Sequence, residues 1–181
     1  MKPLVAVLAA FAAADLAIAA AAAAGLRINT TASMPLGLYR VAPRDAAPIT
    51  RGTVVAVCPP AAALAVALAR NYLRAGTCPG NVEPFLKEVA AVAGDVVDVS
   101  NGGELVNGRA LPASGRLARD CQGRPLAHVA SGRYVVTPGS VWLYAPVAAS
   151  WDSRYYGAAP EANVVGTAQP LVIVGRGSAC S

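Results

Sequence analysis

Serine and lysine are the residue types in this chain that could together perform nucleophilic catalysis. The sequence has one histidine, His128, so a Ser-His-Asp triad would have to use it, and a histidine-rich metal site is excluded. His128 otherwise reads as a surface or strand histidine. Of the 15 basic residues only Lys2 and Lys87 are lysines. A neutral lysine can serve as general base for a serine, whereas arginine stays protonated, so Lys87 is the candidate base.

Lys87 lies in the segment PFLKEVAAVAG, which is apolar on both sides of it. A free lysine has a pKa of about 10.4, and burial among apolar groups lowers that value because the charged form is desolvated. If the segment is a strand, alternation places Lys87 and Val89 on one face, with Leu86 and Glu88 on the other. An inward-facing Lys87 would have the environment that a base needs. An outward-facing Lys87 would be an ordinary strand lysine.

The candidate nucleophile is Ser33, in the stretch TTASMPLGLYR. Pro35 restricts Met34 to extended geometry and so helps to hold Ser33 at a fixed bend before the segment GLYR. Thr31, two residues before Ser33, could turn its hydroxyl towards an oxyanion near the Ser33 backbone amide. The alternative is that Ser33 is a helix-cap or turn residue without a chemical role.

Composition and motifs exclude several other classes of function. The chain is 55% hydrophobic, which argues against disorder, and its net charge of +5 is spread along the sequence without a basic block. A solvated arginine surface explains this charge, so no nucleic-acid partner is expected. Neither GxxxxGK[ST] nor GxGxxG occurs, so nucleotide binding has no support. We expect no metal and no cofactor.

The N-terminal stretch KPLVAVLAAFAAADLAIAAAAAAGL is long and apolar. At about 1.5 Å per residue, a helix over residues 3–26 can span about 30 Å of hydrocarbon. Lys2 sits where a membrane segment carries cytoplasmic positive charge. Asp15 is unfavourable in such a segment, and the alanine pairs also offer signal-peptide cleavage sites. We expect residues 1–26 to be a membrane anchor or a cleaved signal segment, and residues 27–181 to form one exported domain.

The rest of the chain predicts a mainly β fold, a curled β-sheet or barrel with one short helix, preceded by the N-terminal transmembrane helix. The helix is expected in alanine-rich 60–75, and Asn107-Gly108 predicts a type I′ hairpin turn. The hydrophobic residues of the segment 114–132 follow no clear helical or strand period, so we expect this segment to lie outside the core. Short valine-rich segments predict the strands: GLYRV, GTVVAVC, FLKEVAAVAG, DVVDVS, RYVVT, SVWLYAP and NVVGTAQPLVIV.

The four cysteines suit an exported protein, because they lack the close paired spacing of a zinc site. Three pairings are possible. The most local pairing, Cys58 with Cys78, would close the segment that carries the short helix, and Cys121 with Cys180 would be the remaining pair. Four free cysteines are the alternative.

Three stretches in this order, TASMPLGLYR, FLKEVAAVAGDVV and SWDSRYYG, resemble the conserved boxes of the signal peptidase I (S26) superfamily. The SMP step, together with the CPP…CPG insertion, is most similar to the conjugative-transfer peptidases of TraF type. The resemblance implies a signal-peptidase-like fold. It also implies Ser33 as nucleophile, Lys87 as general base, and an oxyanion hole formed by Thr31 and the Ser33 amide.

The third box adds supporting residues by the same resemblance. Ser150 would orient the lysine amine, and Asp152 and Arg154 would be the charged pair that braces the site. The alternative is that this DSR step is an exposed surface turn. Gly94 and Asp95 match a structural turn.

The chain departs from the superfamily pattern at two points. YAPVAAS replaces the usual GDN step, a loss that transfer peptidases tend to share. Glu88 replaces the basic residue that often follows the catalytic lysine. An acid there would raise the lysine pKa if both shared a face, but strand alternation separates them.

The implied function is a membrane-associated serine endopeptidase that processes exported precursors, with a pilin or conjugative-transfer protein as substrate and cyclisation as a possible outcome. It would lie in the bacterial inner membrane with its N-terminus in the cytoplasm and its catalytic domain in the periplasm. The alternatives are a general signal peptidase I that removes secretory leaders, and a non-catalytic β-domain that scaffolds pilus assembly.

Overall fold

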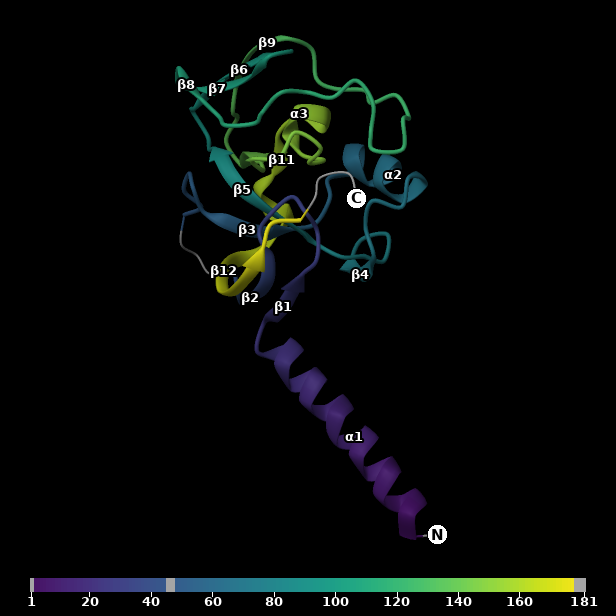
Figure 1. Ribbon diagram of the computed structural model, residues 1–181. Coiled ribbons are helices and arrows are strands. Elements are labelled where there is room, and N and C mark those ends of the chain that lie inside the picture. Colours follow the sequence, from purple (N-terminus) through teal and green to yellow (C-terminus); the bar gives the residue numbers. More distant parts are fainter. Residues whose placement is uncertain (1, 45–47, 178–181) are drawn as a thin grey trace.

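The computed structural model describes residues 2–44 and 48–177. A long helix, α1 (Lys2–Ala23), projects from a β-rich body (Figure 1). Its Pro3–Ala23 part is the one helix among the described residues that is long and apolar enough to cross a membrane. It is not buried against the body, and it coincides with the apolar stretch expected at the N-terminus.

The strands of the body form two antiparallel sheets, so the prediction of a mainly β fold is confirmed. The larger sheet has the order β1-β2-β12-β3-β5-β10-β11, and the smaller one has the order β8-β7-β6-β9. The larger sheet contains β1 (Leu26–Asn29), β2 (Leu36–Pro43), β3 (Val54–Val57), β5 (Phe85–Ala91), β10 (Ser140–Tyr144), β11 (Ala159–Pro160) and β12 (Val164–Gly175). The smaller sheet contains β6 (Val96–Ser100), β7 (Gly103–Val106), β8 (Arg109–Ala110) and β9 (Gly132–Val135).

Strand β5 lies inside the larger sheet, where it pairs with β3 on one side and β10 on the other. Val55 lies opposite Lys87, and Leu143 lies opposite Val89. Six of the seven β5 residues are buried. Valines of β3, β5 and β10 form the main apolar cluster, and burying each one contributes about 1.5–3 kcal/mol. Lys87 therefore occupies a strand that is buried in apolar surroundings.

The helices of the body are short. Helix α2 (Ala61–Ala69) ends six residues before the expected boundary at 75. The chain leaves it at Arg70, and Asn71 follows with a left-handed φ of 54°, which stops the helix. Helix α3 (Ser153–Tyr156) and the 3₁₀ turn η1 (Glu161–Asn163) were not expected, because elements of three or four residues carry no periodic signal.

A disulfide joins Cys58 to Cys78, as the most local pairing predicted. It closes the segment with α2 and β4 (Ala75–Cys78), a short strand that bridges to Val82. Closing a loop of this length stabilises a fold by about 3 kcal/mol through the unfolded state. Cys180 lies outside the described residues, so its pairing with Cys121 stays a prediction.

Two further expectations about the second half of the chain are confirmed. Asn107 and Gly108 connect β7 to β8 with positive φ at both residues, as a type I′ turn requires. The excursion over 114–132 is irregular apart from one isolated bridge, between Arg119 and Pro125, until β9 begins.

Candidate functional site

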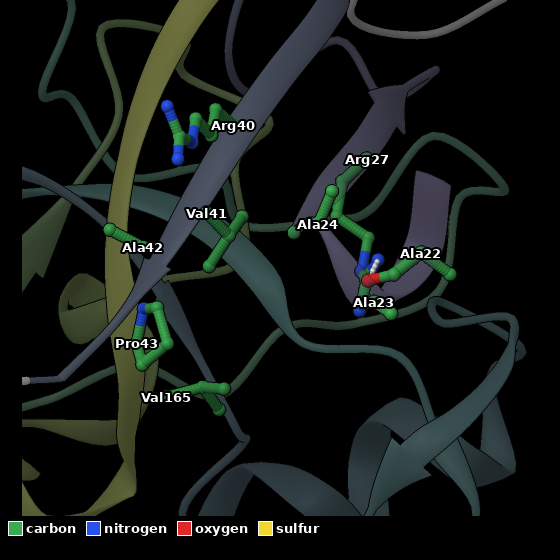
Figure 2. A pocket seen from close by; sticks show the side chains of 10 residues that line it. Ala22, Ala23, Ala24, Arg27, Arg40, Val41, Ala42, Pro43 and Val165 are labelled. Atoms are coloured by element: carbon green, nitrogen blue, oxygen red, sulfur yellow. Dashed lines mark hydrogen bonds between the residues drawn. The ribbon is translucent and has the colours of Figure 1, made fainter. Parts of the chain in front are cut away.

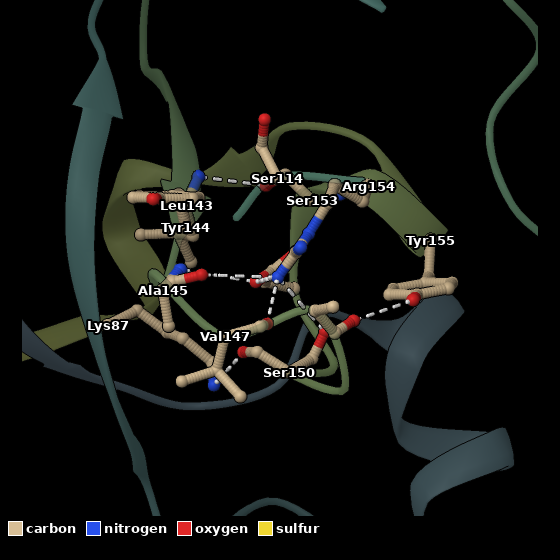
Figure 3. A network of polar contacts seen from close by, with 12 residues as sticks. Lys87, Ser114, Leu143, Tyr144, Ala145, Val147, Ser150, Ser153, Arg154 and Tyr155 are labelled. Atoms are coloured by element: carbon tan, nitrogen blue, oxygen red, sulfur yellow. Dashed lines mark hydrogen bonds and ion pairs between the residues drawn. The ribbon is translucent and has the colours of Figure 1, made fainter. Parts of the chain in front are cut away.

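Lys87 points inward from the middle of β5. Its side chain is 2% exposed, and its Nζ donates a hydrogen bond to Ser150 Oγ at 2.9 Å (Figure 3). Its Nζ also lies 5.5 Å from the centre of the Phe85 ring. Of the two alternatives for Lys87, the inward-facing one is therefore correct.

Burial lowers the pKa of Lys87 from 10.5 to about 8, because the charged amine loses its water. The negative charge of Asp152 raises this pKa, and the positive charge of Arg154 lowers it. Desolvation is the largest of these effects. About half of Lys87 is therefore uncharged at about pH 8, and about a tenth at pH 7, so part of it is able to accept a proton.

Asp152 and Arg154 form a fully buried ion pair, so an exposed DSR turn is ruled out. Both side chains have no exposed surface, and Arg154 Nη2 lies 2.6 Å from Asp152 Oδ2. A second hydrogen bond joins Arg154 Nε to Asp152 Oδ1 at 2.8 Å, so the pair is bidentate. Asp152 also accepts from the Arg154 amide as the N-cap of α3, and from the amide of Ala145. The pair fixes the orientation of the chain just after Ser150.

The Arg154 guanidinium ties three segments together. Its remaining donors reach backbone carbonyls 4 to 41 residues away along the chain. These carbonyls belong to Ala113, Gly115, Ala145, Val147 and Ser150. The loop that carries Ser150 is thereby held against the excursion around residue 114, and the hydroxyl that contacts Lys87 is held with it.

Ser33 lies on the loop 30–35, which connects β1 to β2. It is half-buried, and the neighbouring Met34 side chain is buried in a cluster that also contains Leu86 of β5. The Ser33 loop and the strand that carries Lys87 therefore contribute to the same apolar cluster. Lys87, Ser150, Asp152 and Arg154 form one continuous set of polar contacts, whereas Ser33 and Thr31 stand on this adjacent loop.

Two side chains hold the ends of the Ser33 loop. Asn29 makes hydrogen bonds to Thr31, Met34 and Pro35, and the Tyr39 hydroxyl donates to the Pro35 carbonyl at 2.8 Å. The Thr31 hydroxyl donates to Asn29 Oδ1 at 2.8 Å. For Thr31 to stabilise an oxyanion, that proton must first turn away from Asn29.

A groove of about 640 Å³ leads along this loop. One wall is β1 and the residues after it as far as Thr31, and the other is the segment from Leu73 to Leu86, which contains β4. Ile18 and Ala21 of α1 line its far end, so the groove runs from the apolar helix towards the Ser33 loop. Its volume and largely apolar lining suit an extended peptide.

A second hollow, of about 410 Å³, lies where α1 joins the body (Figure 2). It is lined by residues 22–25, by Arg27 and Val165, and by residues 40–43 of β2. Arg27 donates to the Ala22 carbonyl there, which caps the end of α1. None of the candidate site residues lines this hollow.

Gly94 and Asp95 form the turn between β5 and β6. Gly94 has a φ of +88°, which side-chain-bearing residues rarely adopt. Asp95 accepts from the Val92 amide at 2.9 Å and from the Asn107 side chain at 2.7 Å. The hydrogen bonds lower the pKa of Asp95 against the opposing effect of burial, which is the larger single influence. The turn links the strand of Lys87 to the smaller sheet.

Four buried polar residues were not anticipated from the sequence: Asn29, Glu104, Ser114 and Ser153. Asn29 has no local signal that marks it. Glu104 is 1% exposed and accepts from Trp142 Nε1 at 3.2 Å, and burial, reinforced by the charge of Asp152, raises its pKa to about 7. Alternation with Val106 along the strand GELV would have placed Glu104 on the inner face. His128 is exposed, so it does not belong to the buried network.

The chain is similar to known proteins over most of its length. A family model described as signal peptidase, peptidase S26, matches residues 1–173. The probable conjugal transfer protein TraF of Sinorhizobium fredii (strain NBRC 101917 / NGR234) is 43% identical over 156 residues, covering 86% of this chain and 81% of its own. The conjugal transfer protein TraF of Agrobacterium fabrum (strain C58 / ATCC 33970) is 40% identical, covering 81% and 82%. A plasmid transfer protein TraF of Escherichia coli is 36% identical, covering 84% and 86%.

Among solved structures, a signal peptidase I from Enterococcus faecalis V583 aligns with a TM-score of 0.38 at 15% identity, over 68% of this chain and 98% of that one. The family model extends over nearly all of the chain, and the TraF relatives match it over more than four fifths of its length. The chain therefore belongs to the signal peptidase family, peptidase S26.

Proposed function

We propose that this protein is a serine endopeptidase in which Ser33 is the nucleophile and Lys87 the general base. The observation that carries the proposal is the buried Lys87 amine, which is held by Ser150 and has a pKa lowered to about 8. Neutral Lys87 takes the Ser33 hydroxyl proton as Oγ attacks the scissile carbonyl. The Ser33 amide and the Thr31 hydroxyl stabilise the oxyanion, after the Thr31 proton has left Asn29.

The second half of the reaction follows from the same groups. Collapse of the tetrahedral intermediate breaks the C–N bond, and protonated Lys87 gives its proton to the leaving amine. An acyl-enzyme on Ser33 remains. Water, deprotonated by Lys87, then attacks the ester and releases the carboxylic acid. An amine of the same substrate chain could attack instead and yield a cyclic product.

The names of the relatives support a substrate from conjugal transfer. We propose an exported precursor, a pilin or another transfer protein, that is cleaved at the surface of the bacterial inner membrane. Residues 1–26 would anchor the enzyme with its N-terminus in the cytoplasm, and residues 27–181 would form the periplasmic peptidase domain. The position of the groove, which extends from α1 to Thr31, supports a substrate that arrives from the membrane.

The test is the intact mass of a candidate pilin precursor, encoded near this chain and co-expressed with the wild-type protein, Ser33→Ala or Lys87→Arg. Arginine keeps the charge but cannot act as a base. We expect a lower mass only with the wild-type protein, and a further loss of about 18 Da if the product is cyclic. Lys2→Arg, the same change at the other lysine, should leave processing intact. Processing by Lys87→Arg would exclude Lys87 as the base.

The pKa of Lys87 predicts how the rate depends on pH. We expect kcat/KM to rise about tenfold per pH unit below about pH 8 and to level off above it, since only the neutral amine can accept the Ser33 proton. The measurement is cleavage of a precursor peptide by the full chain in detergent micelles. A rate independent of pH over this range would show that no group with this pKa limits the reaction.

A further inference from the structure

The side chain of Asn29 makes hydrogen bonds to the loop that carries Ser33. Asn29 is the last residue of β1 and is 8% exposed. Its Nδ2 donates to the carbonyls of Thr31, Met34 and Pro35 at 3.1, 3.0 and 2.9 Å. Its Oδ1 accepts from the amide and the hydroxyl of Thr31 at 3.2 and 2.8 Å. One amide group thus contacts residues on both sides of Ser33.

These contacts take the place of backbone pairing. The β1–β2 ladder ends where Asn29 pairs with Gly37. Beyond it, residues 30–35 form no strand pairing, and Ala32 and Ser33 lie in a turn. The Met34 carbonyl is buried and needs a partner, which Asn29 provides. The two protons of the Asn29 Nδ2 group, one of them shared, also serve the part-buried carbonyls of Thr31 and Pro35. The bend at Ser33 therefore depends on a side chain that precedes it by four residues.

Asn29 also sets the direction of the Thr31 hydroxyl. A hydroxyl has one proton to donate, and in this structure it points to Asn29 Oδ1. The contact between Asn29 Oδ1 and the Thr31 amide is independent of that proton. Thr31 can therefore turn its hydroxyl towards another acceptor while its backbone stays fixed.

We propose that Asn29 is the positioning residue of the nucleophile loop. It holds Ser33 at the bend through the carbonyls of Thr31, Met34 and Pro35, and it holds the Thr31 hydroxyl in place until an oxyanion forms. This inference rests on the proposed function, because it assigns Asn29 a role through Ser33 and Thr31. Asn29 itself does not react.

The test compares Asn29→Ala with the wild-type full chain in detergent micelles, using the precursor peptide. We expect kcat to fall about 100-fold, as for a small displacement of a reacting group, with KM changed less than about threefold. The pH at which the rate levels off should stay near about 8, because Lys87 keeps its surroundings. Asn163→Ala is the matched control. Asn163 also donates to a backbone carbonyl, that of Cys58, at 3.2 Å. The kcat of the Asn163→Ala variant should stay near the wild-type value.

Asn29→Asp provides a second, isosteric variant in case Asn29→Ala does not fold. The carboxylate would face the three carbonyls that Asn29 Nδ2 now serves, and it would hold the Thr31 proton more strongly. We expect its kcat to fall below that of Asn29→Ala, although it preserves the volume. An unchanged kcat in either folded variant would overturn the proposal. A raised KM with normal kcat would also overturn it and would make Asn29 a substrate contact, since Asn29 lines the groove. If the wild-type protein cleaves nothing, the proposed function itself fails.

Discussion

Replacing Lys87 with methionine is expected to stabilise the protein while abolishing peptide cleavage. The fall in the Lys87 pKa from 10.5 to about 8 corresponds to about 3 kcal/mol of unfavourable free energy for the charged amine in the folded state. Methionine fills similar space without that charge. It leaves Ser150 Oγ without its donor, which costs about 1 kcal/mol. At pH 7 we therefore expect a net gain of about 2 kcal/mol in the free energy of unfolding.

The gain should depend on pH in a defined direction. Between about pH 8 and pH 10.5 the unfolded chain still holds the lysine proton and the folded chain does not, so the stability of the wild-type protein rises with pH. The advantage of Lys87→Met is therefore full below about pH 8 and is lost as the pH approaches about 10.5, above which only the cost of about 1 kcal/mol at Ser150 remains. Urea unfolding of the full chain in micelles at several pH values measures this.

Lys87→Arg is the matched control for the stability experiment. Arginine stays charged at every accessible pH, so we expect this variant to be less stable than the wild-type protein, and to fall further behind it as the pH rises above about 8. A Lys87→Met variant less stable than wild type at pH 7 would contradict the account, because it would mean that burial of the amine carries no net penalty.

The sequence alone predicted the features that local pattern determines. Lys87 could be singled out because it is the one lysine after the N-terminal stretch and lies in an apolar strand. The spacing of Cys58 and Cys78 pointed to the disulfide, and Asn107-Gly108 to the hairpin. The family resemblance drew attention to Asp152 and Arg154, but the residues themselves were equally compatible with an exposed turn.

The remaining features arise from contacts between segments far apart in the chain. Arg154 reaches the Ala113 carbonyl 41 residues away, and no periodicity encodes such a contact. Asn29 is a polar residue at a strand end, and its five hydrogen bonds exist only once the following loop has folded back over it. The end of α2 was misplaced because Arg70, Leu73, Arg74 and Ala75 still favour helix, whereas the left-handed residue Asn71 stops it.

Asp152→Ala is expected to lower the free energy of unfolding by about 3–5 kcal/mol, because it leaves the Arg154 guanidinium charged and fully buried without its counter-ion. The carbonyls around Arg154 stay in place but carry only partial charges. Asp98→Ala is the matched control. Asp98 pairs with Arg133, whose side chain is 72% exposed, so its removal should change stability by less than about 1 kcal/mol.

The double variant Asp152→Ala/Arg154→Met separates a buried charge from general loss of packing. With no charge left to bury, we expect it to recover part of the stability lost in Asp152→Ala. If the losses of stability from the two substitutions simply add, the double variant will be less stable than Asp152→Ala. That result would show that Asp152 does not stabilise the protein through its ion pair with Arg154.

The same aspartate also acts on the proposed base. Because the charge of Asp152 raises the pKa of Lys87 and that of Arg154 lowers it, neutralising Asp152 lowers the pKa of Lys87 further. In Asp152→Asn, which keeps the shape of the side chain, the rise of kcat/KM should therefore level off at a lower pH than in the wild-type protein. A shift to higher pH would contradict this. A loss of the maximal rate in Asp152→Asn would come from the weaker basicity of the amine or from a displaced Ser150 loop, since the base itself is more often neutral.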